Sequence, residues 1–77
     1  MNDKINLMIT DMENRIKWEQ EAIDNYMAQI KEDIASYDEY RLVTFLPGMI
    51  NRIEEARNRR EKYNEQLKML QFIQREN

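Results

Sequence analysis

The sequence predicts an all-α protein, an antiparallel hairpin of two long amphipathic helices. Two observations predict this fold. Apolar residues recur every seven positions in both halves of the chain, a spacing that keeps side chains on one stripe of gently supercoiled helices. Glycine and proline occur only once each in the 77 residues, side by side at positions 48 and 47. This composition is typical of a helical protein with a single interruption.

The first helix is expected over residues 3–37. Along one line of its apolar stripe, each residue follows the previous one by seven positions, namely Ile9, Ile16, Ile23, Ile30 and Tyr37. The companion position of the same repeat is occupied by Ile5, Met12 and Tyr26. A helix of this length measures roughly 50 Å at 1.5 Å per residue.

The second helix is expected over residues 46–75. Its two seam positions are occupied by Leu46, Ile53 and Leu67, and by Met49, Ala56, Tyr63 and Leu70. Pro47 suits the first turn of a helix, where its missing N–H needs no partner. Arg60 interrupts the stripe, but its aliphatic stem can lie along apolar surface while the guanidinium reaches water.

Residues 38–45 are expected to connect the two helices, with their conformation left open between a loop, a short helix and an extension of the first helix. Ser36 and Glu39 have the spacing of a capping box, and Thr44 is a candidate cap for the second helix. The connection is unusually apolar, with Tyr40, Leu42, Val43, Phe45 and Leu46. We expect these residues to fold back over the end of the bundle, or else to form a surface for a target.

The chain forms one domain, residues 1–77, that is too small to be stable without help. Chains this short usually depend on disulfides, a metal or oligomerisation, and this one has no cysteine or histidine. Two helices also enclose no interior. We therefore expect a homodimer, in which two hairpins form a four-helix bundle. The expected oligomer seam comprises Ile9, Ile16, Ile23, Ile30, Tyr37, Ile53, Tyr63, Leu67 and Leu70.

Enzymatic activity is not expected, and neither is a cofactor, a metal or a small-molecule ligand. Without His or Cys, the common nucleophilic triads and histidine metal sites cannot form, and a single glycine excludes phosphate-binding loops. Glu19 and Asp33 fall at seam positions, where edge placement or fixing of the helix register is the expected role. Arg60 is a candidate partner for either carboxylate.

Charge divides the chain into an acidic half and a basic half. Residues 1–40 carry ten acids and four bases, a net charge of −6, whereas residues 41–77 carry five acids and eight bases, a net charge of +3. Attraction between an acidic and a basic helix favours antiparallel neighbours, within the hairpin or between two copies.

Two charged clusters are candidate partner surfaces. The basic cluster comprises Arg52, Arg57, Arg59, Arg60 and Lys62. We do not expect nucleic-acid binding there, because acidic residues are interleaved and no reading motif is present. The acidic flank comprises Asp11, Glu21, Asp24 and Glu32, and it could dock onto a basic surface of a target protein.

A separate apolar surface is expected away from the seams. It comprises Leu7, Trp18, Met69 and Phe72. Tryptophan is enriched at interaction hot spots, so Trp18 is expected to contact either a neighbouring hairpin or a different protein.

The function that these patterns favour is protein–protein interaction or assembly, as a scaffold or adaptor acting through helix faces. The alternative is a small acidic regulator that inhibits a larger enzyme or nucleic-acid-processing complex, in the style of proteins encoded by phages and mobile elements. The expected partners are a second copy and/or a larger protein. No apolar run is long enough to span a membrane, and the expected location is the cytoplasm, that of the host if a phage encodes the chain.

Overall fold

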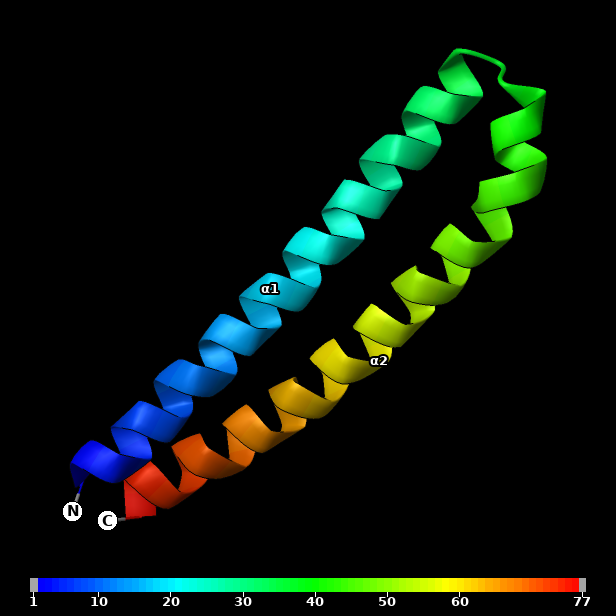
Figure 1. Cartoon of the computed structure of the whole chain (residues 1–77). Helices are drawn as coiled ribbons and strands as arrows, with labels where there is room; N and C mark the ends of the chain where they lie inside the picture. The colour runs from blue at the N-terminus through cyan, green and yellow to red at the C-terminus, as the bar shows by residue number, and fades with distance from the viewer. Residues whose placement is uncertain (1, 77) are drawn as a thin grey trace.

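Two antiparallel helices of nearly equal length make up the fold. The computed structural model describes residues 2–76, in which α1 spans Asn2–Ala35 and α2 spans Glu39–Glu76. The helices lie side by side, with the start of α1 next to the end of α2 (Figure 1). The rod that they form measures 56 × 14 × 13 Å. The all-α hairpin predicted from the seven-residue repeats is confirmed.

The seam between the helices contains the residues of the predicted stripes. On α1 the half-buried large apolar residues are Ile5, Ile9, Met12, Ile16, Ile23, Tyr26 and Ile30. On α2 they are Leu42, Leu46, Ile53, Tyr63, Leu67 and Leu70, together with the buried Met49 and Ala56. Within residues 2–76, Met49 at 8% exposure and Ala56 at 1% are the only buried apolar side chains. Each helix therefore covers the other from one side only.

Polar pairs across the hairpin define how the helices are aligned. Near the chain ends, Gln74 Nε2 donates a hydrogen bond to Asn6 Oδ1. In the middle, Arg60 donates to Gln20 Oε1 over 2.5 Å. In both pairs the two residue numbers add up to the same total. Each step forward along α1 therefore corresponds to one step back along α2. This register places the seam residues of the two helices opposite each other.

A tight three-residue turn joins the helices, in place of the eight-residue connection expected over residues 38–45. The backbone N–H of Tyr37 donates to Ile34 O over 3.1 Å, and that of Asp38 donates to Asp33 O over 3.2 Å. This bonding pattern terminates a helix when the residue at the turn adopts a left-handed conformation. Tyr37 does so, with φ of 51°.

Three sequence predictions at the turn are therefore corrected. The first helix ends at Ala35 rather than at residue 37, and Tyr37 is 84% exposed, so it lies outside the seam. The cap of α2 is neither Thr44 nor a box formed by Ser36 and Glu39. Instead, Asp38 Oδ1 accepts a hydrogen bond from the Arg41 N–H over 3.0 Å.

The second helix begins at Glu39, seven residues before the predicted start, and includes Pro47 in its interior. Proline there removes the N–H that would bond to the Val43 carbonyl. Val43 is 73% exposed, so water can reach this part of the helix. The half-buried Leu42 and Leu46 extend the seam across this stretch. The apolar connection thus forms the first turns of α2 and does not fold back over the end of the hairpin.

Gly48 lies inside α2, and substitution by alanine tests whether a glycine is needed at this position. A Cβ atom added at Gly48 meets nothing within 4 Å, so Gly48→Ala should raise the free energy of unfolding by about 1 kcal/mol. The matched change Ala28→Gly, at an exposed position of α1, should lower it by a similar amount. Urea denaturation at one protein concentration measures both. A loss of stability in Gly48→Ala would show that the structure requires a residue without a side chain at this position.

Tyr37 provides a test of the turn. Because a left-handed conformation costs a side-chain-bearing residue about 1 kcal/mol, Tyr37→Gly should stabilise the protein by about that amount or slightly less. Ser36→Gly is the control, since Ser36 lacks a positive φ and its Oγ donates to Asp33 O over 3.3 Å; it should be destabilising. If the two substitutions changed the melting temperature equally, the left-handed conformation of Tyr37 and the hydrogen bond of Ser36 would both be contradicted.

Candidate functional site

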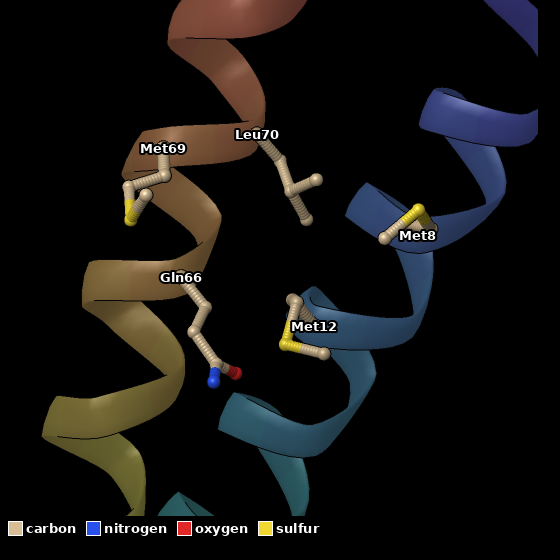
Figure 2. Close-up of a pocket in the computed structure, with 5 residues that line it drawn as sticks. All are labelled: Met8, Met12, Gln66, Met69 and Leu70. Carbon is tan, nitrogen blue, oxygen red and sulfur yellow. The ribbon is translucent and has the colours of Figure 1, made fainter.

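An apolar groove lies between the helices near the ends of the chain. It is an open hollow of about 320 Å³ lined by Met8, Met12, Gln66, Met69 and Leu70. Figure 2 shows Met8 and Met12 of α1 across from Leu70 and Gln66 of α2, with Met69 beside them on α2. Methionine side chains are flexible and polarisable, so they fit apolar partners of various shapes. We call this set of five residues the methionine groove.

The predicted apolar surface of Leu7, Trp18, Met69 and Phe72 is only partly brought together. All four side chains are exposed, Trp18 at 62%, and the hairpin places Leu7 and Phe72 at the same end. Trp18 follows Leu7 by 11 residues of the same helix and therefore lies roughly 16 Å along the rod. Trp18 forms a separate feature of the α1 surface.

The groove is not evident from the sequence, because its residues belong to different patterns. Met12 and Leu70 follow the seam pattern and Met69 belongs to the outer apolar surface, whereas Met8 belongs to neither. Met8 directly precedes the seam residue Ile9, which places it on one side of the stripe. This position next to the seam is the signal that could have identified it.

A second exposed apolar surface lies near the turn. On α1, Met27 and Ile34 are seven residues apart and are 43% and 57% exposed. On α2, Val43 and Ile50 have the same spacing and are 73% and 43% exposed. Met27 and Ile34 directly follow seam positions, whereas Met8 precedes one. The turn surface, as we call these four residues, therefore lies on the opposite side of the seam from the methionine groove.

The acidic flank is partly neutralised by neighbouring side chains of α1. Asp11 Oδ2 pairs with Arg15 Nε at 2.9 Å, and Asp24 Oδ1 accepts a hydrogen bond from Gln20 over 2.9 Å. The Arg15 guanidinium lies 5.6 Å from the centre of the Tyr63 ring on α2. Hydrogen bonding with Tyr63, followed by the charge of Asp11, raises the pKa of Arg15 above its ordinary value. Arg15 thus links the acidic flank to the seam.

The basic cluster is also engaged within the hairpin. Arg57 pairs with Glu61 on the same helix at 3.3 Å. Arg59 pairs with Glu19 of α1 at 2.5 Å, and hydrogen bonding to Glu19 raises the pKa of the Arg59 guanidinium. The expected pairing of Arg60 with Glu19 or Asp33 is wrong, because Arg60 bonds to Gln20. Glu19 does act across the seam, but through the neighbouring arginine.

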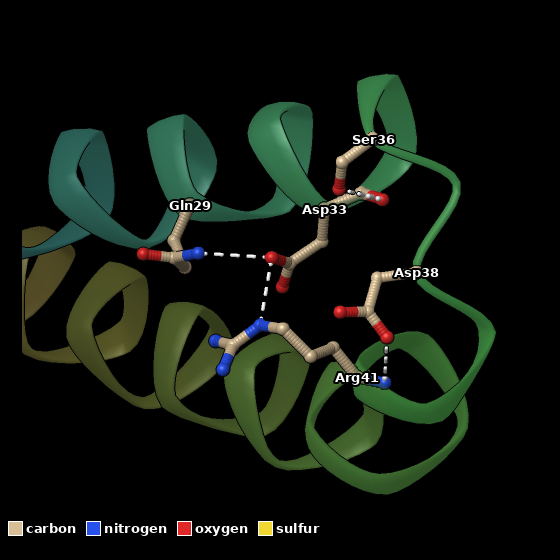
Figure 3. Close-up of polar contacts among 5 residues, drawn as sticks. All are labelled: Gln29, Asp33, Ser36, Asp38 and Arg41. Atoms are coloured by element: carbon tan, nitrogen blue, oxygen red, sulfur yellow. Dashed lines mark hydrogen bonds and ion pairs between the residues drawn. The ribbon is translucent and has the colours of Figure 1, made fainter.

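Asp33 is the one buried charged residue of the described chain, at 2% exposure. Its Oδ1 accepts hydrogen bonds from Gln29 Nε2 and from Arg41 Nε, each over 2.9 Å (Figure 3). Within residues 2–76, no group donates to its Oδ2. Asp33 is therefore buried in the seam, and the alternative expectation that it lies at the edge of the seam is wrong. Its pair with Arg41 joins the last turns of α1 to the first turn of α2.

An aromatic ring lies close to the arginine of this ion pair. The Arg41 guanidinium lies 5.0 Å from the centre of the Phe45 ring, within the range of a cation–π interaction. Phe45 in turn meets Tyr40 edge to face, with ring centres 6.3 Å apart. Arg41 thus has both a charged and an aromatic partner.

Comparisons of the chain with models of protein families, with curated proteins and with solved structures each give no match. Neither helix, over residues 2–76, contains an apolar stretch of the length needed to cross a membrane. Among the same residues, no group of three or more acidic, histidine or cysteine side chains is placed to hold a metal ion. What the hairpin does must be inferred from its surfaces.

The Asp33–Arg41 pair gives an asymmetric prediction. Arg41→Ala leaves a buried carboxylate without its cation and should lower the free energy of unfolding by about 2–3 kcal/mol. Asp33→Leu instead places an apolar side chain in the seam, and the 40% exposed Arg41 can turn to water, so stability should change little or rise. Arg52→Ala, at an exposed position, is the control and should stay within about 0.5 kcal/mol.

Chemical denaturation of the three single variants and of the Asp33→Leu, Arg41→Ala double variant measures these effects. The double variant should be more stable than Arg41→Ala alone, since the unpaired carboxylate is gone. Equal losses for Arg41→Ala and Asp33→Leu would show that the carboxylate is not held in an interior environment.

Proposed function

We propose that this protein is a non-enzymatic assembly module, an interaction protein that acts through its helix faces and covers its apolar surfaces by pairing with a second copy. One observation carries the proposal. Of the apolar side chains in residues 2–76, two are buried, while thirteen large ones are exposed by more than two fifths. Stable monomers seldom expose so much apolar surface, and exposed apolar patches mark sites of interaction.

The thinness of the hairpin supports the same proposal. Burying a Leu or Ile side chain completely contributes about 1.5–3 kcal/mol, and a side chain covered from one side gains only part of this. A second hairpin packed on one face would cover seam residues from a further direction. A four-helix bundle achieves this with the same helices and no new structural elements.

Charge supports a second copy as the partner. Helix α1 has eight acids and four bases, a net charge of −4, whereas α2 has six acids and eight bases, a net charge of +2. Each copy therefore provides both a negative and a positive helix, so two copies can match one another without another protein.

The proposal predicts self-association that depends on concentration. Sedimentation equilibrium from low to high micromolar concentration should show a dimer, and the melting temperature should rise with protein concentration because dissociation accompanies unfolding. Circular dichroism confirms helicity in each sample. A cooperatively melting monomer throughout this range, with a melting temperature independent of concentration, would refute the proposal.

A regulator that binds a larger protein is the second candidate, and the exposed Trp18 favours it. Trp18 is 62% exposed on α1, and the exposed Glu21 is three residues further along the same helix. An aromatic side chain beside carboxylates suits a basic surface of a target protein. This candidate is supported if a single larger protein from the native host binds at sub-micromolar concentration and Trp18→Ala removes that binding. Retention of binding in Trp18→Ala would count against it.

A further inference from the structure

We infer that the methionine groove is the contact between two copies, related by a two-fold axis parallel to the long axis of the hairpin, with α1 of each copy on α2 of the other. This inference rests on the self-association proposed above and specifies its geometry. The groove, the charge of the two helices and the dimensions of the hairpin each contribute to it.

The groove is apolar, open and left unfilled by the hairpin itself. Four of its five lining residues are apolar, and Met69 is 66% exposed. A two-fold axis through this face brings the same groove of a second copy against it, so that each set of methionines fills the hollow of the other. Such self-matching contacts are the usual form of homodimer interfaces.

Two hairpins can meet through this face with the two-fold axis along the rod or across it. An axis along the rod keeps like ends together, so the grooves meet and each α1 lies antiparallel on the partner's α2. An axis across the rod puts the chain ends of one copy on the turn of the other and stacks α1 on α1. The groove then faces no second groove.

Electrostatics selects the same arrangement. With the axis along the rod, a helix of net charge −4 lies on one of net charge +2, twice in the dimer. With the axis across the rod, the two helices of −4 lie on each other, as do the two of +2. Like charges placed together across an interface are unfavourable and exclude wrong pairings. Neighbouring helices are antiparallel in both arrangements, so the difference between them lies in charge and in whether the grooves meet.

The size of the face is adequate for a stable dimer. A face of 56 by 14 Å has an area of roughly 800 Å², the product of the two dimensions. Stable interfaces bury about 800 Å² on each partner. Two hairpins in full contact therefore reach the standard size, whereas two that overlap only at their ends do not.

The axis along the rod also determines which residues meet. Rotation about this axis leaves every residue at its own level, so Met8 of one copy stays level with the segment of α2 that contains Met69. These two residues should therefore lie close together between copies. With the axis across the rod, Met8 would instead lie level with the far part of α1, near Glu32.

Single cysteine variants test this geometry directly, since the chain has no cysteine of its own. Mixing Met8→Cys chains with Met69→Cys chains under mild oxidation should give a disulfide between the two, identified by mass spectrometry of the linked peptides. A mixture of Met8→Cys with Ile50→Cys chains is the background control, because Ile50 lies on the opposite side of the seam. A mixture of Met8→Cys with Glu32→Cys chains should give no more disulfide than this control. Preferential linkage to residue 32 would overturn the inference.

A matched pair of charge variants separates this inference from the proposed function. Met69→Glu should weaken the dimer at least tenfold in sedimentation, whereas Ile34→Glu, at a similarly exposed position of the turn surface, should leave it unchanged. Loss of the dimer in Ile34→Glu but not in Met69→Glu would overturn the groove interface and leave self-association intact. A monomeric unmodified protein would overturn both. Circular dichroism verifies that each variant remains helical.

Discussion

The rest of this structure depends on a geometric constraint, namely that two helices alone cannot surround a side chain. Every seam residue touches the facing helix on one side and solvent or a neighbour on the others. Even along a seam with an almost unbroken seven-residue repeat, only Met49, Ala56 and Asp33 are buried within the described chain. Ala56 achieves this because it is small enough to lie beneath its neighbours. The exposed apolar surfaces follow from this shortage of cover.

Polar contacts determine the alignment that an apolar seam alone leaves free. A stripe of Ile, Leu and Met tolerates slippage by one repeat, since each shifted position is again apolar. Glu19 with Arg59, and Gln20 with Arg60, interrupt the stripe at mid-length and match only in one register. Such contacts add little stability where they are exposed, but they discriminate against misaligned pairings.

The seven-residue repeats predicted both helices and nearly all seam residues, because the periodicity is a property of the chain itself. The turn was predicted poorly. Pro47 indicated a helix start, yet the helix begins at Glu39, since the seam contacts of Leu42 and Leu46 extend it across the proline. Tyr37 continued the repeat but adopts the left-handed conformation that glycine usually supplies. Tertiary contacts overrode local preference at Pro47, whereas local hydrogen bonds of the turn accompany the conformation of Tyr37.

The methionine groove could be predicted only in part. Its residues on α1 lie more than fifty positions in sequence from those on α2, and the register of the two helices brings them together. Met8 is distinguished only by its position directly before the seam residue Ile9, whereas Met69 lies clearly off the seam. The pairing partners of the arginines were equally inaccessible from sequence, because Arg59 and Arg60 are neighbours in the chain and differ only in the direction of their side chains.

The Asp33–Arg41 pair has a consequence for the integrity of the hairpin. A short turn with a strained residue is the kind of hinge that can straighten, allowing two chains to exchange helices and form a domain-swapped dimer. In a single continuous helix, residues 33 and 41 would be roughly 12 Å apart along the axis, too far for the 2.9 Å contact seen here. Straightening would therefore break this pair within the chain. The ion pair thus opposes opening of the hairpin, the step that must precede any exchange of helices.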